Sequence, residues 1–255
     1  MTWLRLSLAA MMVISSSLAV PTAQAISPVG VVFGTTWDGP GQDLQTIVDG
    51  YLGAPGLLNV HTDFVGAHVG DLDPWFWASS SFPTLLITEI AGNANTNELG
   101  WYRETFTRPV IDGVDDGVLF TGGEGSGVST FVSFPSGLQK FGFYLDTHTM
   151  VTTPSGIQRQ VFLTNRMLND VGPAGYPATH APANGDVQAL VFDVSRWKGP
   201  NTWLVCFEDT DSGRPVGPCC DNTDNDFNDL VFQITAAGAT PTLRLSFGAL
   251  KATYR

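Results

Sequence analysis

Basic residues are scarce in this chain, and their scarcity limits the partners that it can bind. Lys and Arg together number 12 against 24 Asp and Glu, which gives a formal net charge of −12 at pH 7. Such a charge repels the phosphates of nucleic acids and the headgroups of anionic lipids. Only five of the acidic residues are Glu and the other 19 are Asp, which favours turns and metal-binding loops. The composition excludes nucleic acid as an expected partner and favours β structure with ion-binding loops.

Long apolar segments are also missing, apart from one at the N-terminus. The stretch from Leu6 to Val20 follows Arg5 and precedes a small-residue motif that ends at Ala25. This order is typical of a secretory signal peptide, and the apolar run is shorter than the ~20 residues of a membrane span. We expect cleavage near Ala25 to remove residues 1–25. The mature chain is then secreted by a bacterium, into the periplasm or the extracellular space, and has no membrane span.

Cysteine is rare as well, with three residues in the whole chain, at Cys206, Cys219 and Cys220. An oxidising compartment permits a disulfide, and the odd number leaves one thiol over. A bridge from Cys206 to either of the other two would close the loop between them, and a ring between the adjacent pair is the alternative. Neither the cysteines nor the four histidines fall at zinc-ligand spacings.

The distribution of apolar residues predicts an all-β protein with one short helix. Leu44, Ile47, Val48 and Tyr51 recur at helical spacing and indicate a helix near residues 43–51, with Asp43 at its start and Gly53 at its end. Short runs rich in Val, Ile, Phe and Thr, separated by turn residues, predict strands. These strands are expected at 57–65, 84–90, 117–120, 128–134, 141–146, 159–163, 187–194, 203–208, 230–235 and 243–247.

The number and length of these strands are typical of a β-sandwich or a jelly-roll-like fold. Alternation predicts that Phe141 and Phe143 share one face of a strand and that Phe232 and Ile234 share one face of another. We see no linker or internal repeat between residues 26 and 255. One domain is therefore expected, with an acidic loop at 208–229.

Carboxylates are concentrated in that loop, and a strand is expected on each side of it. Two like charges about 4 Å apart cost roughly 1 kcal/mol in water and more when buried, and a bound cation removes this cost. Asp and Asn oxygens are the hard ligands that Ca²⁺ prefers. If the flanking strands form a hairpin, the two ends of the loop face each other. The predicted ligands are Glu208, Asp209, Asp211, Asp224, Asp226, Asn228 and Asp229.

The loop is not an EF-hand, although Asp224, Asp226 and Asn228 have the spacing that opens one. The sixth position is Asp229 instead of Gly, and the twelfth is Thr235 instead of Glu. The alternative to a metal site is a solvated loop in which Asp and Asn bond their own backbone.

The segments EDTDSG and DNDFNDLVFQI resemble the signature of a bacterial exported module, domain of unknown function 4114. Further segments, among them DLDPWFW and LLITEIAGNANTNELGWY, resemble secreted proteins that carry a Pro-Glu-Pro sorting tail, which this sequence does not show. The resemblance covers most of the mature chain. It implies a β-sandwich and a Ca²⁺ role for Asp224, Asp226, Asn228 and Asp229, and it implies no established activity.

The sequence thus predicts a secreted, non-catalytic, Ca²⁺-stabilised module with a structural, adhesive or extracellular-binding role. Its expected partner is extracellular matrix, a glycan or a protein. One alternative is a carbohydrate-binding module in which Trp75 and Trp77 stack on a sugar, unless both rings point into the core and Phe76 points outward. The other alternative is a glycoside hydrolase, which needs two carboxylates about 5–10 Å apart, for example from Glu89, Glu98 and Glu104.

Overall fold

The computed structural model describes residues 31–35, 38–68, 74–78, 81–91, 94–133, 139–153, 156–169, 187–210, 223–235 and 238–239. The predicted signal peptide, the strand predicted at 243–247, Asp211, Cys219 and Cys220 lie outside these residues. No helix of the described residues is long and apolar enough to cross a membrane.

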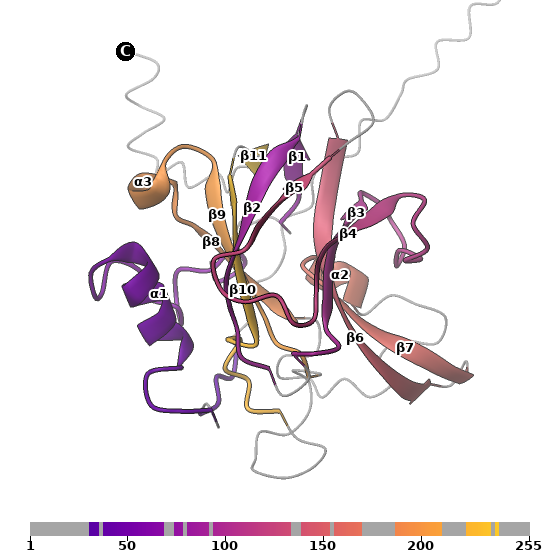
Figure 1. The fold of residues 1–255 in the computed structure, drawn as a ribbon, viewed down its shortest axis with the longest axis horizontal. Coiled ribbons are helices and arrows are strands. Elements are labelled where there is room, and N and C mark those ends of the chain that lie inside the picture. The colour runs from indigo at the N-terminus through magenta and orange to yellow at the C-terminus, as the bar shows by residue number, and fades with distance from the viewer. Residues whose placement is uncertain are drawn as a thin grey trace, which may run out of the picture.

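Two antiparallel sheets form the fold (Figure 1). The first has the order β11-β1-β6-β3-β4, and β7 also pairs with β6. Its strands are β1 (Phe76–Ala78), β3 (Glu98–Arg103), β4 (Asp116–Thr121), β6 (Gln139–Thr153), β7 (Gly156–Leu163) and β11 (Gly238–Ala239). The second has the order β5-β2-β10-β9-β8. Its strands are β2 (Phe82–Glu89), β5 (Ser129–Val132), β8 (Ala189–Asp193), β9 (Thr202–Phe207) and β10 (Leu230–Thr235).

The main hydrophobic core lies between the two sheets. Phe141, Phe143 and Leu145 of β6 and Phe232 and Ile234 of β10 all belong to one buried cluster. The rings of Phe143 and Phe232 meet edge to face, with centroids 5.0 Å apart. Each strand therefore turns the face predicted by its alternation towards the core. The predicted all-β sandwich is confirmed.

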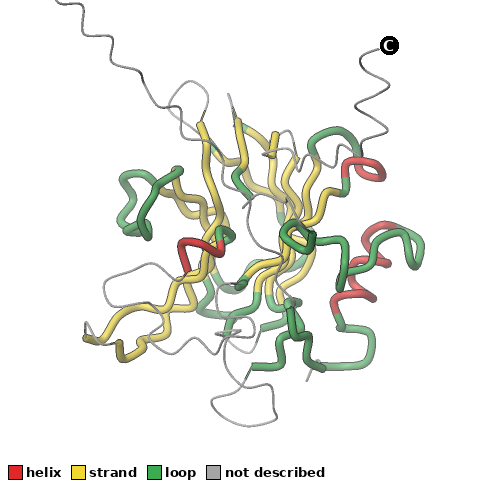
Figure 2. The backbone as a smooth tube through the Cα atoms, turned by 180° about the vertical axis from the view of Figure 1, so that it is seen from behind, coloured by secondary structure: helices red, strands yellow, loops and turns green. Residues whose placement is uncertain are grey.

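A second hydrophobic layer covers the outer face of the second sheet. Helix α1 (Leu44–Leu52) lies on this side, as does α3 (Ser195–Lys198), whereas α2 (Arg166–Asn169) lies near β7 (Figures 1 and 2). Leu44 and Val48 of α1 pack with Leu204 and Cys206 of β9. Because both faces of β9 are covered, all six of its residues are buried.

The ends of α1 agree with the sequence. Asp43 is the N-cap, and its Oδ1 accepts a hydrogen bond from the N–H of Thr46 at 3.0 Å. Gly53 ends the helix with φ 86°, a left-handed conformation that glycine adopts without steric cost. The predicted helix and both of its boundary residues are confirmed.

The strand predicted at 57–65 is wrong, because this segment forms turns. Its apolar residues Leu58, Val60 and Phe64 are buried against α1, which explains the strand-like pattern. The backbone N–H of Asn59 donates to Asp63 at 2.9 Å, and that of His61 donates to the side chain of Asn59 at 3.0 Å. These local bonds replace the ladder of a sheet. Strands β1, β3 and β11 are additions that the sequence did not predict.

A close approach between β3 and β6 gives a test of the packing. A Cβ atom at Gly100 would overlap the ring of Tyr144, which is fully buried. We expect Gly100→Ala to lower the free energy of unfolding by about 1–3 kcal/mol, as overpacking does in other cores. The melting temperature measured by circular dichroism should fall by roughly 2–4 °C for each kcal/mol.

The matched control is Gly50→Ala in α1, where an added Cβ meets no atom within 4 Å. This change should be neutral or should stabilise the protein by about 0.5–1 kcal/mol, because alanine favours helices. Equal melting temperatures for the Gly100→Ala variant and the wild type would show that the strands separate easily here.

Candidate metal centre

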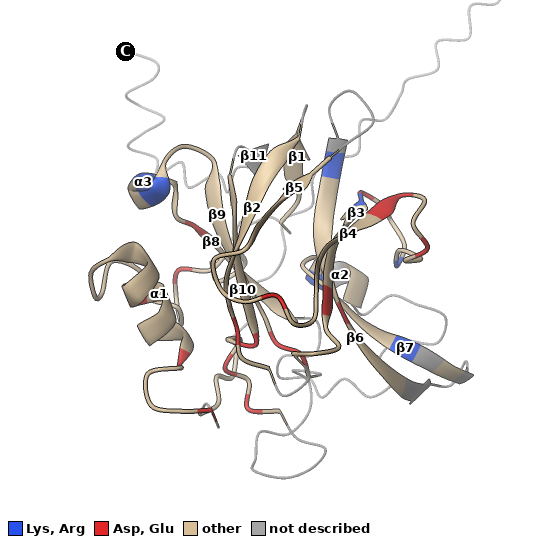
Figure 3. Cartoon of the chain, in the orientation of Figure 1, with Lys and Arg blue, Asp and Glu red and all other residues tan. Residues whose placement is uncertain are grey.

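The pairing of β9 with β10 brings the two ends of the acidic loop together. The strands are antiparallel, and Phe207 is the cross-strand partner of Leu230. Glu208 and Asp209 directly follow β9, and Asp229 directly precedes β10. The hairpin predicted from the sequence is confirmed, and acidic residues gather at this end of the second sheet (Figure 3).

The segment 223–229 is bent by two residues with left-handed backbone conformations. Asn225 has φ 49° and Phe227 has φ 57°, which is unusual for a bulky residue such as Phe. The ring of Phe227 is fully buried and meets the ring of Phe33 edge to face at 5.8 Å. The Thr223 hydroxyl accepts a hydrogen bond from the N–H of Asn225 at 3.0 Å. These contacts fix the path of the chain between Asp224 and Asp229.

Five carboxylates converge at this point, and Glu208 lies at their centre. Oxygen atoms of Glu208, Asp224 and Asp226 lie within 4.8 Å of one another, as do those of Glu208, Asp209 and Asp229. Four of the five residues are buried, with exposures of 1% for Glu208, 6% for Asp209, 6% for Asp226 and 8% for Asp229. We call these five residues the central site.

Two members of the central site accept hydrogen bonds from uncharged groups. Glu208 accepts from the hydroxyl of Thr223 at 3.0 Å and from the backbone N–H of Phe227 at 3.3 Å. Asp229 accepts from the backbone N–H of Asp209 at 2.7 Å. Within the described residues, no hydrogen-bond donor to Glu208 or Asp229 carries a positive charge that would neutralise it.

The ionised forms of these carboxyls are therefore disfavoured. Burial raises the pKa of Glu208 well above its usual range, and the charges of Asp224, Asp226 and Asp209 raise it further. Burial also raises the pKa of Asp229, with added repulsion from Glu208 and Asp209. A cation at this position would remove both the repulsion and much of the cost of burial.

The central site is also linked to the start of the described chain. Asn228 is fully buried, and its Nδ2 donates to the carbonyl of Gln42 at 2.6 Å and to Asp38 at 3.2 Å. The backbone N–H of Gly34 donates to the carbonyl of Asn225 at 3.1 Å. Because the amide nitrogen of Asn228 has this structural role, its oxygen is the atom suited to a cation.

The donor set fits Ca²⁺. All ligand atoms of the central site are carboxylate oxygens, which Ca²⁺ binds at about 2.3–2.6 Å in sets of six to eight. In each group of three, the carboxylate oxygens lie within 4.8 Å of one another, which is close enough for all three to bind one such ion. Zinc prefers four ligands with nitrogen and sulfur, and neither group of three contains His or Cys.

The predicted site residues have different outcomes. Glu208, Asp209, Asp224, Asp226 and Asp229 come together in the central site, and Asn228 lies in the same loop, tied to the segment before α1. Cys206 is a free thiol, fully buried on the α1 side of β9. Thr223 supports Glu208 and was not among the predicted residues, although Thr-x-Asn is a pattern typical of such side-chain turns.

The alternative in which Trp75 and Trp77 point into the core is wrong for the main core between the sheets. Phe76 takes that position and is fully buried, whereas both Trp rings are half-buried on the opposite side of β1. The Nζ of Lys140 lies 5.4 Å from the ring centroid of Trp75 and 5.3 Å from that of Trp77. Lys140 also forms an ion pair with Glu104. Both rings thus already bind a cation of the chain itself.

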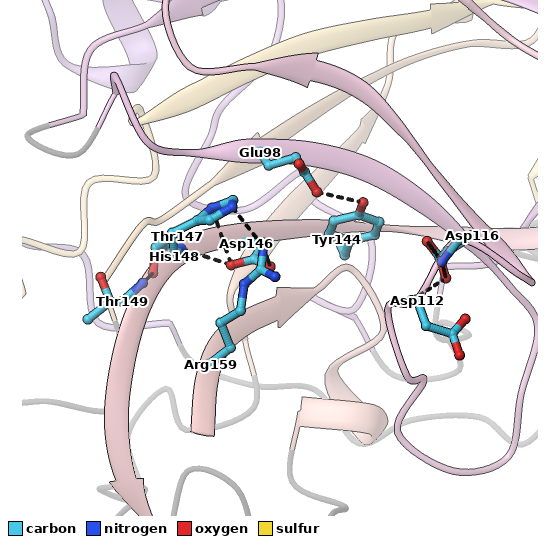
Figure 4. A network of polar contacts seen from close by, with 10 residues as sticks. Glu98, Asp112, Asp116, Tyr144, Asp146, Thr147, His148, Thr149 and Arg159 are labelled. Carbon is cyan, nitrogen blue, oxygen red and sulfur yellow. Dashed lines mark hydrogen bonds and ion pairs between the residues drawn. The ribbon is translucent and has the colours of Figure 1, made fainter. Parts of the chain in front are cut away.

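Another buried carboxylate, Asp146 of β6, shows how the fold neutralises a charge elsewhere (Figure 4). Its exposure is 1%, and it forms an ion pair with Arg159 of β7 at 2.7 Å. The same guanidinium lies 2.7 Å from Nε2 of His148, which therefore accepts the hydrogen bond. Nearby, the hydroxyl of Tyr144 donates to Glu98 at 3.1 Å. An arginine balances Asp146, in contrast to the uncharged donors around Glu208.

Comparison with known proteins identifies no relative. The chain matches no family model, no curated protein and no solved structure.

The raised pKa values predict how stability depends on pH when a chelator removes divalent ions. A folded protein whose carboxyls have raised pKa values holds protons that the unfolded chain releases near the ordinary Glu value of 4.5. This contribution is fully present below that pH and is lost as pH rises. The melting temperature in chelator should therefore fall between pH 5 and pH 8, measured by circular dichroism.

Asp229→Asn should raise the melting temperature at pH 8 in chelator and reduce the slope. The amide oxygen keeps the bond from the N–H of Asp209, and a buried charge is removed. The expected gain is roughly 2–4 °C for each kcal/mol of repulsion. Asp115→Asn is the control, since Asp115 is an exposed residue that pairs with Arg103 far from the cluster. A lower melting temperature for Asp229→Asn than for wild type would contradict the repulsion.

Proposed function

We propose that this protein is a secreted, non-catalytic β-sandwich module that binds Ca²⁺ at the central site. The ion neutralises the carboxylates at the end of the second sheet and holds the loop between β9 and β10 in one conformation. The module has a structural, adhesive or binding role outside the cell, with matrix, a glycan or a protein as its partner. The observation that carries this proposal is the convergence of five carboxylates around the buried side chain of Glu208.

The burial of the site supports an ordering role over a catalytic one. Glu208, Asp209, Asp226 and Asp229 are each at most 8% exposed, so little of the site faces a substrate. A metal that performs catalysis keeps a position open for water or substrate. An ion that is enclosed by side chains instead stabilises the fold, because it binds the folded chain and not the unfolded one.

Two features of the sequence support a setting outside the cell. The first 25 residues have the pattern of a signal peptide, and the resemblance to exported bacterial modules includes Asp224, Asp226, Asn228 and Asp229. Extracellular Ca²⁺ modules bind with Kd values of about 10⁻⁴–10⁻³ M. Such an affinity is matched to the millimolar Ca²⁺ of many external media, so the ion would be bound after export.

Ca²⁺ should raise the melting temperature of the mature protein, and chelator should reverse the gain. At a Ca²⁺ concentration ten times Kd, one site adds about 1.4 kcal/mol to the free energy of unfolding, or roughly 3–6 °C in a chain of this length. Differential scanning fluorimetry in Ca²⁺, in Mg²⁺ and in chelator measures this difference. Mg²⁺ should give a smaller gain, because it retains its waters and demands octahedral geometry.

Asp226→Asn is the matched test of the site. Its amide oxygen can still accept the bond from the N–H of Asn228, which Oδ1 of Asp226 accepts at 3.1 Å, so the loop is supported while one charged ligand is lost. This variant should lose most of the gain from Ca²⁺, and Asp115→Asn should keep all of it. Identical melting curves of the wild type in Ca²⁺ and in chelator would rule out the proposal.

A further inference from the structure

A second group of oxygen atoms lies beside the central site. It consists of the side chains of Glu89, Asn97 and Glu124 together with Asp209, which also belongs to the central site. We call this group the flanking site. The four residues come from four separate segments: the end of β2, the segment before β3, the loop between β4 and β5, and the segment after β9.

Pairing of β2 with β10 places Glu89 next to the acidic loop. Glu89 is the last residue of β2 and is the cross-strand partner of Leu230 in β10. Beyond this pair, the backbone N–H of Ile90 donates to the carbonyl of Asp229 at 2.9 Å. Because Leu230 is also paired with Phe207 of β9, Glu89 and Asp209 leave the sheet at the same end.

The loop that carries Glu124 is held against β2 and against the segment before β3. The backbone N–H of Gly127 donates to the carbonyl of Leu86 at 2.8 Å, and the N–H of Leu86 donates to the carbonyl of Val128 at 2.9 Å. A Cβ atom at Gly122 would overlap the backbone of Ala94 and Asn95. Glycine at this position thus lets the loop lie directly on the segment that leads to Asn97.

Asn97 gives the clearest indication that a ligand binds here. Its exposure is 1%, and its Nδ2 donates to Oδ2 of Asp209 at 3.4 Å, which places the amide against the carboxylates. Its Oδ1 is buried and accepts no hydrogen bond in the described part of the chain. A buried amide oxygen without a donor is costly, and native structures rarely leave one in this state.

Two carboxylate oxygens of the described residues are likewise buried without a hydrogen-bond donor. Oε1 of Glu89 and Oε2 of Glu124 are buried and receive no hydrogen bond from the described residues, while the other oxygen of Glu124 accepts from the hydroxyl of Thr121 at 2.9 Å. The pKa of Glu89 is raised to about 7 by burial, by the charge of Glu124 and by that of Asp209. Glu124 and Asp209 therefore both repel the charge of Glu89.

We propose that the flanking site binds a second divalent cation, with Ca²⁺ as the class of ion that its oxygen donors fit. Three acceptors without donors and one further carboxylate exceed what a single water, with two protons, can satisfy. A hard cation binds carboxylate and amide oxygens of this kind. Asp209 is the ligand common to both positions. This inference rests on the proposed function for the identity of the ion, and it adds a position outside the loop 208–229.

The test counts bound ions in the wild type and in Glu89→Gln/Glu124→Gln. Both substitutions keep the shape of the side chain and remove its charge. Isothermal titration calorimetry with CaCl₂, together with metal analysis after equilibrium dialysis, gives the number of ions per chain. We expect the double variant to bind one ion fewer near the wild-type Kd, or to bind that ion on the order of tenfold more weakly. Glu124→Gln alone changes a residue on a surface loop and should weaken the same ion.

The results for the two sites are distinguishable. Asp226→Asn should weaken an ion that the double variant still binds, and Asp115→Asn should leave both stoichiometry and affinity unchanged. An equal number of ions, bound with equal affinity, in the wild type and in the double variant would overturn the flanking site and leave the proposed function standing. A wild type that binds no ion at all would overturn both. Circular dichroism of each variant confirms that the sheets are formed.

Discussion

Repulsion between buried carboxylates is the constraint on which this end of the molecule depends. Glu208 lies among four other acidic side chains and accepts hydrogen bonds from a hydroxyl and a backbone N–H. Among the described residues, its neighbours are other carboxylates and uncharged donors. This end of the second sheet therefore carries a local cost in free energy, because the pairing of β9 with β10 brings the charges together.

The two hydrophobic layers make this arrangement stable enough to persist. The core between the sheets fixes the register of β10 against β9 and β2 through residues such as Phe232 and Leu86. On the other side of the second sheet, Phe227 packs in the layer that α1 covers. The acidic loop is therefore attached to apolar anchors at both faces of the sheet. Its carboxylates cannot swing into solvent without removing Phe227 from that layer.

Much of this architecture could be predicted from the sequence, because it follows from local patterns. The alternation in β6 and β10, the helical spacing from Leu44 to Tyr51 and the clustering of Asp after β9 are all visible without a structure. The apolar pattern of the segment 57–65 is that of a strand, but turns bury its apolar residues against α1. For Trp75 and Trp77, alternation predicts that both rings lie on one face of the chain but does not predict which face is buried, since either face of β1 has aromatic residues.

The parts of the site that the sequence could not predict are those supplied by distant segments. Nothing in the surroundings of Asn97 marks it as a neighbour of Asp209, and Glu89 and Glu124 resemble any other acidic residue near a turn. Gln42 supports Asn228 through its backbone carbonyl, so the type of side chain at position 42 does not indicate this contact. Contacts of this kind follow from strand order, which no local pattern encodes.

The bonds from Asn97 to Asp209 and from Asn228 to Gln42 join residues that are 112 and 186 positions apart. Closing chain segments of that length is slow and entropically costly, and it is rewarded only when the sheets are already in register. These two bonds therefore depend on segments from both halves of the chain. They join the acidic residues of the β9–β10 hairpin to the parts of the fold that precede β3 and α1.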